Sequence, residues 1–113
     1  MTARNPLLSA PPYPVEQALK KLGADIRTAR LRRNLTIAEV AQKIGAGTRA
    51  ISDAEKGKPS TSIAVYAALL WAFDLLGQLK QAADPDKDEE GKALAHAKGR
   101  RRARASGGLN NDF

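Results

Sequence analysis

Apolar residues in the central part of the chain recur every three or four positions, which is the spacing of one face of an α-helix. Between residues 15 and 33 this face carries Leu19, Leu22, Ile26 and Ala29. The sequence offers no run in which apolar and polar residues alternate over the length of a strand. The pattern therefore predicts a helix over 15–33 and an all-α fold.

Four more helices are expected, each bounded by residues that start or stop a helix. Thr36 and Glu39 form a capping-box pattern that opens a helix over 36–44. Gly45, with Ala46 and Gly47, makes a turn before a second short helix over 48–56, since glycine permits the positive φ of a sharp turn. An apolar helix over 62–73 and a short helix over 74–83 complete the five. The positions expected to face the core are Val40, Ala41, Ile44, Ile51, Ala54, Ile63, Tyr66, Ala67, Leu70 and Phe73.

The chain outside residues 15–83 is predicted to form two tails. Residues 1–14 contain four prolines, which favours an extended arm. Residues 84–90 hold five acids and one base, whereas residues 92–104 hold six bases and no acid. We expect residues 84–113 to form an acidic loop and a basic tail, with a flexible end at SGGLNNDF.

The composition narrows the classes of function. The 113 residues carry a net charge of +7 and a pI near 10.1, which favours a polyanion as partner. Cysteine is absent and His96 is the single histidine, so thiolate chemistry and a histidine metal site are excluded. The sequence contains no nucleophile–base set, phosphate loop or long apolar run. We therefore expect no enzymatic activity, cofactor, metal, small-molecule substrate or membrane contact.

A helix-turn-helix pattern lies between Leu35 and Ser60. Its residues are Leu35, Val40, Ala41, Ile44, Gly45, Ile51, Glu55 and Gly57. With this spacing the segment resembles the Xre/phage-repressor family of helix-turn-helix proteins, over about residues 22–73. The resemblance implies a five-helix, lambda-repressor-like DNA-binding domain in which the helix over 48–56 enters the major groove.

The resemblance also implies which residues contact bases. The family's base-contacting positions fall on Gly47, Thr48, Arg49 and Asp53, and Ser52 shares their outward face. Arg49 is the strongest candidate because a guanidinium can bind guanine O6 and N7 together. Asp53 repels phosphates, and three roles stay open for it: accepting from cytosine N4, orienting Arg49, or remaining solvated.

The same family places phosphate contacts around the helix-turn-helix. They are expected at Thr36, Lys56, Lys58 and Ser60. Ile37 stands where the family often has a glutamine, so Thr36 and backbone amides are expected to replace that contact. Arg30 and Glu55 occupy positions that form a partly buried ion pair in this family, which implies a structural role. Arg27, Arg32 and Arg33 add positive charge, and the sequence does not show which of them face DNA.

The apolar helix over 62–73 predicts a second surface. Beyond its core face it carries a stripe of Ala64, Val65, Ala68, Trp71 and Leu75, and a helix that is apolar all round is normally buried on both sides. A homodimer is the simplest explanation, and it would supply two half-sites for a palindrome. The alternative is that the last short helix folds back and covers the stripe with Leu76 and Leu79.

The apolar helix and the segments after it narrow the resemblance to one group of proteins. The apolar helix, the acidic loop, the basic stretch and the acid–aromatic end are together similar to HipB-type antitoxins. This implies a dimer that represses its own operon and helps neutralise a HipA-type serine/threonine kinase in the bacterial cytoplasm, at the nucleoid when DNA-bound. A stand-alone repressor without a toxin and a nonspecific nucleoid-type binder are the alternatives. The basic tail could follow DNA, dock on the toxin or stay solvated; its residues are Lys98, Arg100, Arg101, Arg102 and Arg104.

Overall fold

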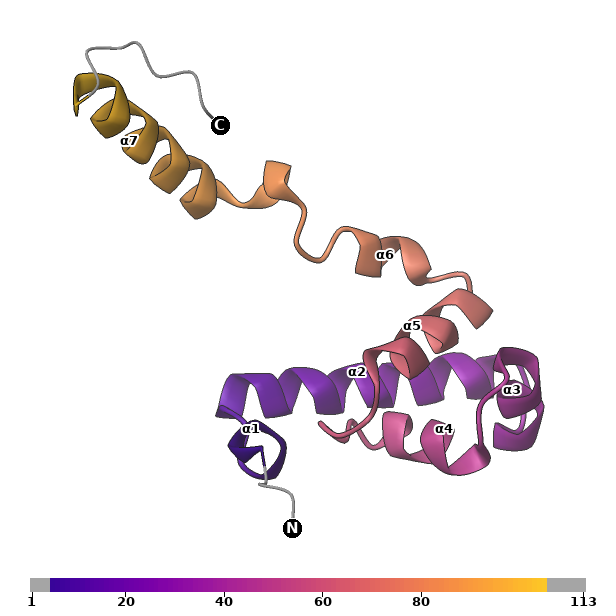
Figure 1. Cartoon of the computed structure of the whole chain (residues 1–113). Helices are drawn as coiled ribbons and strands as arrows, with labels where there is room; N and C mark the ends of the chain where they lie inside the picture. The colour runs from indigo at the N-terminus through magenta and orange to yellow at the C-terminus, as the bar shows by residue number, and fades with distance from the viewer. Residues whose placement is uncertain (1–4, 106–113) are drawn as a thin grey trace. The chain divides into compact units, whose positions relative to one another are not determined.

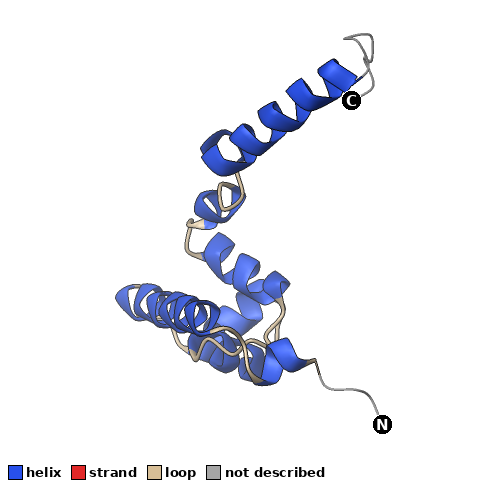
Figure 2. Cartoon of the chain, turned by 90° about the vertical axis from the view of Figure 1, so that its left-hand side faces the viewer, coloured by secondary structure: helices blue, strands red, loops and turns tan. Residues whose placement is uncertain are grey.

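The computed structural model describes residues 5–105, and every regular element in that range is a helix (Figure 2). The all-α class predicted from the sequence is therefore confirmed. Seven α-helices are present in the described residues instead of the five expected. The chain divides between Leu79 and Lys80 into two compact units.

The first unit contains the two helices of the helix-turn-helix and the helices around them (Figure 1). Their bounds are α1 Pro6–Ser9, α2 Tyr13–Arg32, α3 Ile37–Ile44, α4 Thr48–Glu55 and α5 Ile63–Ala72, followed by α6 Leu76–Lys80 at the boundary between the units. The second unit holds a 3-10 turn, Pro85–Lys87, and α7, Glu89–Ala105.

Local signals place the ends of these helices. The Thr36 hydroxyl accepts from the Glu39 amide at 3.1 Å, and the Glu39 carboxylate accepts from the Thr36 amide at 2.9 Å, so the predicted capping box is confirmed. Gly45 ends α3 with a left-handed φ of 75°. The Ser62 hydroxyl caps α5 by accepting from the Ala64 amide at 3.0 Å.

The core of the first unit lies among α2, α3, α4 and α5. In Figure 1, α4 runs beside α2, and α3 contacts both α4 and α5. The largest fully buried side chains are Ile26, Val40, Ile51, Leu69 and Phe73. These residues come from all four helices, so the two helices of the motif are held on a shared core.

The N-terminal arm is not extended over its described part. Residues 6–9 form α1, whose first turn is capped by the Asn5 side chain accepting from the Leu7 amide at 3.0 Å. The next helix starts at Tyr13, two residues earlier than expected, because Pro14 fits the first turn, where a missing N–H costs nothing. Residues 1–4 of the predicted arm lie outside the described residues.

The basic tail is also helical where it is described. Asp88 accepts from the Gly91 amide at 2.9 Å, and Glu89 and Glu90 occupy the first turn of α7. Acids at the start and bases near the end complement the helix macrodipole, which explains why this charged segment is a helix instead of a loop. The end expected to be flexible, residues 106–113, lies outside the described residues.

Two expectations for the apolar helix and its successor were wrong. Ile63 was expected in the core but is 67% exposed, while Leu69, which was not expected there, is 0% exposed. Since α5 is apolar on every side, its pattern could not identify the buried face. The following helix spans Leu76–Lys80 instead of 74–83, and its start is delayed because Asp74 adopts a left-handed φ of 60°.

Candidate nucleic-acid interface

The residues predicted to read bases lie together on α4. Gly47 is the N-cap of this helix, and Thr48 and Arg49 are exposed in its first turn. Ser52 and Asp53 follow on the same side and are partly exposed. The opposite side of α4 carries Ile51 and Ala54, which are both 0% exposed. The helix therefore presents a polar edge while its apolar edge is anchored in the core.

Two glycines bring α2 against the end of α4. A Cβ on Gly23 would lie 2.5 Å from the Ala54 carbonyl oxygen and 2.7 Å from the Glu55 carbonyl oxygen. A Cβ on Gly57, whose φ is 69°, would collide with the backbone of Leu19. The two backbones are thus in direct contact. The role of Gly23 was not predicted from the sequence, although a glycine inside a helical pattern is a signal of close packing.

Arg30 and Glu55 form a buried ion pair between α2 and the last turn of α4. The Arg30 Nε lies 2.6 Å and its Nη2 3.0 Å from the two carboxylate oxygens of Glu55. A third donor, Nη1, reaches the Leu35 carbonyl at 2.9 Å. The hydrogen bonds that Arg30 donates to Glu55 raise the pKa of Arg30 above its usual value. This bidentate pair fixes the position of α4, because separating the two groups would leave a charge without a partner.

Asp53 and Lys58 are brought together at the other end of the outward face. The Lys58 Nζ lies 3.1 Å from the Asp53 carboxylate, and the Lys58 amide donates to the Asp53 carbonyl at 3.1 Å. The Tyr66 hydroxyl donates to the Lys58 carbonyl at 3.1 Å, which ties this turn to α5. Burial raises the pKa of Tyr66. A predicted base contact and a predicted phosphate contact are thus partners in the free protein.

The remaining predicted phosphate contacts, Thr36, Lys56 and Ser60, are all exposed. Lys56 and Ser60 are exposed in the turn after α4. The Thr36 hydroxyl uses its oxygen in the capping box, so its proton is free to be donated to a phosphate. Gly47 has no side chain to cap α4; the Ala50 amide donates to the Gly47 carbonyl at 3.1 Å, and the amides of Thr48 and Arg49 are left for an anion or water.

Arg33 has a structural role that the sequence did not reveal. Its guanidinium donates to the Ala29 carbonyl at 2.8 Å and to the Phe73 carbonyl at 3.1 Å. It also lies 5.1 Å from the centroid of the Phe73 ring. Arg27 and Arg32 are exposed. Among these three arginines, Arg33 is the one whose hydrogen bonds link α2 to the end of α5.

The stripe predicted as an interface is divided between core and surface. Val65 and Leu75 pack against the core. Trp71 is 56% exposed, Ala64 is exposed and Ala68 is partly exposed. Trp71 is therefore not covered by the helix that follows.

Ile63 adds to this exposed surface of α5. It is eight residues before Trp71, with Ala67 midway, and residues four apart share one face of a helix. In the described part of the chain, an apolar surface thus runs along α5 from the exposed Ile63 past the partly buried Ala67 to the exposed Trp71.

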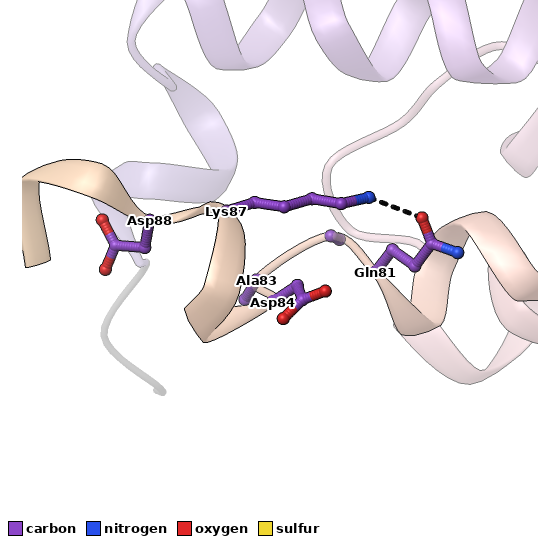
Figure 3. Close-up of a pocket in the computed structure, with 6 residues that line it drawn as sticks. Gln81, Ala83, Asp84, Lys87 and Asp88 are labelled. Atoms are coloured by element: carbon purple, nitrogen blue, oxygen red, sulfur yellow. Dashed lines mark hydrogen bonds between the residues drawn. The ribbon is translucent and has the colours of Figure 1, made fainter. Parts of the chain in front are cut away.

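The second unit holds an open hollow of about 420 Å³ lined by Gln81, Ala82, Ala83, Asp84, Lys87 and Asp88 (Figure 3). The Lys87 Nζ donates to the Gln81 side-chain oxygen at 2.6 Å. Both carboxylates bind backbone amides, Asp84 that of Asp86 and Asp88 that of Gly91, each at 2.9 Å. These acids serve as caps for the turn and for α7.

The bases of the predicted tail belong to α7. Lys98, Arg100 and Arg102 are exposed, as is His96. Arg101 and Arg104 lie in the same helix, but their side chains are outside the described part. Across residues 5–105, no three histidine, cysteine or acidic side chains are grouped so that they could hold a metal ion. The described helices include none that is long and apolar enough to cross a membrane.

Comparison with known proteins agrees with this architecture. A family model described as a helix-turn-helix domain matches residues 21–83, which is more than half of the chain. A search of the curated proteins and of the solved structures found no match. The matched range contains α3, the Gly45 turn and α4, the pair of helices with which such domains bind the major groove. The chain belongs to the helix-turn-helix domain family.

Proposed function

We propose that this protein is a sequence-specific transcription regulator that reads duplex DNA with α4. One observation carries the proposal: Ile51 and Ala54 anchor α4 in the core while Thr48 and Arg49 are exposed on its first turn. Membership of the helix-turn-helix family supports DNA as the partner. A recognition helix contacts base edges mainly through its N-terminal residues, and these are the exposed ones.

Arg49 is the proposed base reader. Its guanidinium can donate two hydrogen bonds to guanine O6 and N7, and such a pair discriminates by about 1–3 kcal/mol against a wrong base. Thr48 touches a thymine methyl group or a phosphate. Gly47 lets the DNA backbone approach the start of α4, and Ser52 lies one turn further along the same edge.

The ion pair between Asp53 and Lys58 is proposed to open on DNA. Lys58 exchanges the carboxylate for a phosphate, with Lys56, Ser60 and Thr36 as further phosphate contacts. A partly exposed ion pair near the surface contributes about 1 kcal/mol or less, so the exchange costs little free energy. Asp53 is then left to accept from cytosine N4.

The apolar face of α5 is proposed to bind a second copy of the chain. Exposed Trp71 and Ile63 with the small Ala64 and Ala68 give a surface that an isolated domain would leave in water. A twofold dimer presents two α4 helices to the two halves of a palindromic operator.

At a finer level we propose that the regulator is a HipB-type antitoxin, which represses its own operon in the bacterial cytoplasm and neutralises a HipA-type kinase. The resemblance of the segments after Leu75 supports this role. The alternative is a stand-alone repressor, which the family match supports equally. Co-purification of the tagged protein from its native cell separates the two, because a stand-alone repressor brings no kinase with it.

The DNA-reading proposal is tested by fluorescence anisotropy with the duplex upstream of the protein's own gene and with a scrambled duplex. Arg49→Ala should weaken binding to the upstream duplex by about 1–3 kcal/mol and leave binding to the scrambled one little changed. Arg49→Lys is the matched control: it keeps the charge but loses the bidentate geometry, so it should also lose discrimination. Equal affinity of the unaltered protein for both duplexes would refute the proposal.

A further inference from the structure

The charges of α7 are separated along its length. Glu89 and Glu90 occupy its first turn, and from Lys92 to Arg104 the sequence has six bases and no acid. None of its described side chains is buried, and Leu94 is 62% exposed. Burial in a core therefore does not account for this helix or for its composition.

Lys92, the base nearest to the acids of α7, makes its contacts within the second unit. The Lys92 Nζ donates to the Asp86 carbonyl at 2.6 Å and lies 3.4 Å from a Glu89 carboxylate oxygen. From Lys98 to Arg104 the sequence contains no acid, and within residues 5–105 no ion pair involves Lys98 or Arg100. The excess charge of α7 thus lies in its second half.

Helix stability explains part of this charge but not all of it. Cations near a helix C-terminus interact favourably with the macrodipole, by about 0.3–1 kcal/mol each within the last turn. Lys98 and Arg100, however, lie before the last turn of α7, so the macrodipole does not account for them. Phosphates along the helix would supply counter-charges for these two side chains.

We infer that α7 is a second DNA-binding element, which contacts the phosphate backbone of the duplex beside the site read by α4. The inference rests on the proposed function. Residues 81–88 connect α7 to α6, so a duplex held by α4 meets α7 at a high effective concentration. Phosphate contacts carry no sequence information, so α7 adds affinity without adding specificity.

The composition of α7 favours DNA over a membrane surface. A helix that lies in a membrane interface needs a broad face of large apolar residues. In α7 the apolar residues are alanines and the single Leu94. A helix with many bases and no broad apolar face is suited to surface contact with a polyanion such as DNA, and not to insertion into a membrane interface.

The test uses the full chain with three neutral substitutions, Lys98→Gln, Arg100→Gln and Arg102→Gln. Glutamine has a helix propensity close to those of lysine and arginine, so α7 should persist, and circular dichroism checks this. Anisotropy is measured from low to moderate salt on the upstream and the scrambled duplex. A charge-preserving control exchanges lysine and arginine at the same three positions.

The slope of log affinity against log salt should fall by up to about 3, because each phosphate contact contributes about 0.9. Affinity should fall by the same factor on both duplexes, with the preference for the upstream duplex retained, and the control should keep the original slope.

An unchanged slope on both duplexes, with the upstream preference intact, would overturn the inference and leave the proposed function standing. A loss of affinity for anionic vesicles or for a co-purified kinase, with DNA binding unaltered, would also overturn it. If the unaltered protein shows no preference for its upstream duplex, the proposed function fails, and the inference falls with it.

Discussion

Replacing Gly23 by alanine should displace α4. The added Cβ would lie 2.5 Å from the Ala54 carbonyl oxygen, whereas ordinary contacts begin at 3.4 Å. The neighbouring atoms belong to the backbone of α4 and of the turn after it, so no side-chain rotation can relieve the contact. The two helices must separate by about 1 Å at this point.

The cost follows from two opposing effects. Overpacking of a close-packed site costs about 1–3 kcal/mol, and alanine regains up to about 1 kcal/mol of helix propensity over glycine. We expect a net loss of roughly 1–2 kcal/mol in the free energy of unfolding. Because the shift moves α4 itself, affinity for the upstream duplex should fall as well.

Urea unfolding followed by circular dichroism measures the stability, and anisotropy measures DNA binding. Gly77→Ala in α6 is the matched control, because a Cβ there meets no atom within 4 Å. The control should be as stable as the original chain or slightly more so. A Gly23→Ala variant that unfolds at the same urea concentration and binds DNA equally well would show that the contact between α2 and α4 is not tight.

Three other substitutions probe the ion pair, the capping box and the α5 surface. Glu55→Gln should lower the free energy of unfolding by about 3–5 kcal/mol, since it leaves the Arg30 charge buried without a counter-ion; a loss below 1 kcal/mol in urea unfolding would contradict this. Hydrogen bonding to the Thr36 amide lowers the pKa of Glu39, so the charged form stabilises the fold. The advantage of the original chain over Glu39→Gln should be full above about pH 4.5 and vanish as the pH falls through the lowered pKa; thermal unfolding that shows a pH-independent difference would refute it. Trp71→Ala should shift the protein towards monomer in sedimentation, and an unchanged mass would remove Trp71 from the dimer surface.

Much of the helix-turn-helix could be predicted because its signals are local. The capping box of Thr36 and Glu39, the left-handed Gly45 and the buried Ile51 and Ala54 all follow from residues a few positions apart. Such signals act through hydrogen bonds and backbone sterics within one turn, so they do not depend on distant parts of the chain. The outward position of Arg49 follows from the same helical spacing.

The helices α1 and α7, near the two ends of the chain, were harder to predict from the sequence. Prolines in the arm and a charge run in the tail are typical of extended or solvated chain. Asn5 and Asp88 nevertheless cap the first turns of α1 and α7, and opposite charges at the two ends of α7 favour the helix. These effects are local. Composition alone does not show whether the free energy they contribute exceeds the cost in conformational entropy of forming the helix.

The sequence was sufficient for the class of fold and for the edge of α4 that is exposed, since both depend on residue spacing within single helices. Tertiary contacts decided how α4 is held and which side of α5 is buried. Gly23 meets the end of α4, Lys58 turns back onto Asp53, and Arg33 reaches the Phe73 carbonyl across 40 positions in the sequence. Partners so far apart become neighbours once the helices pack, and a helix that is apolar on all sides has no face of its own until then.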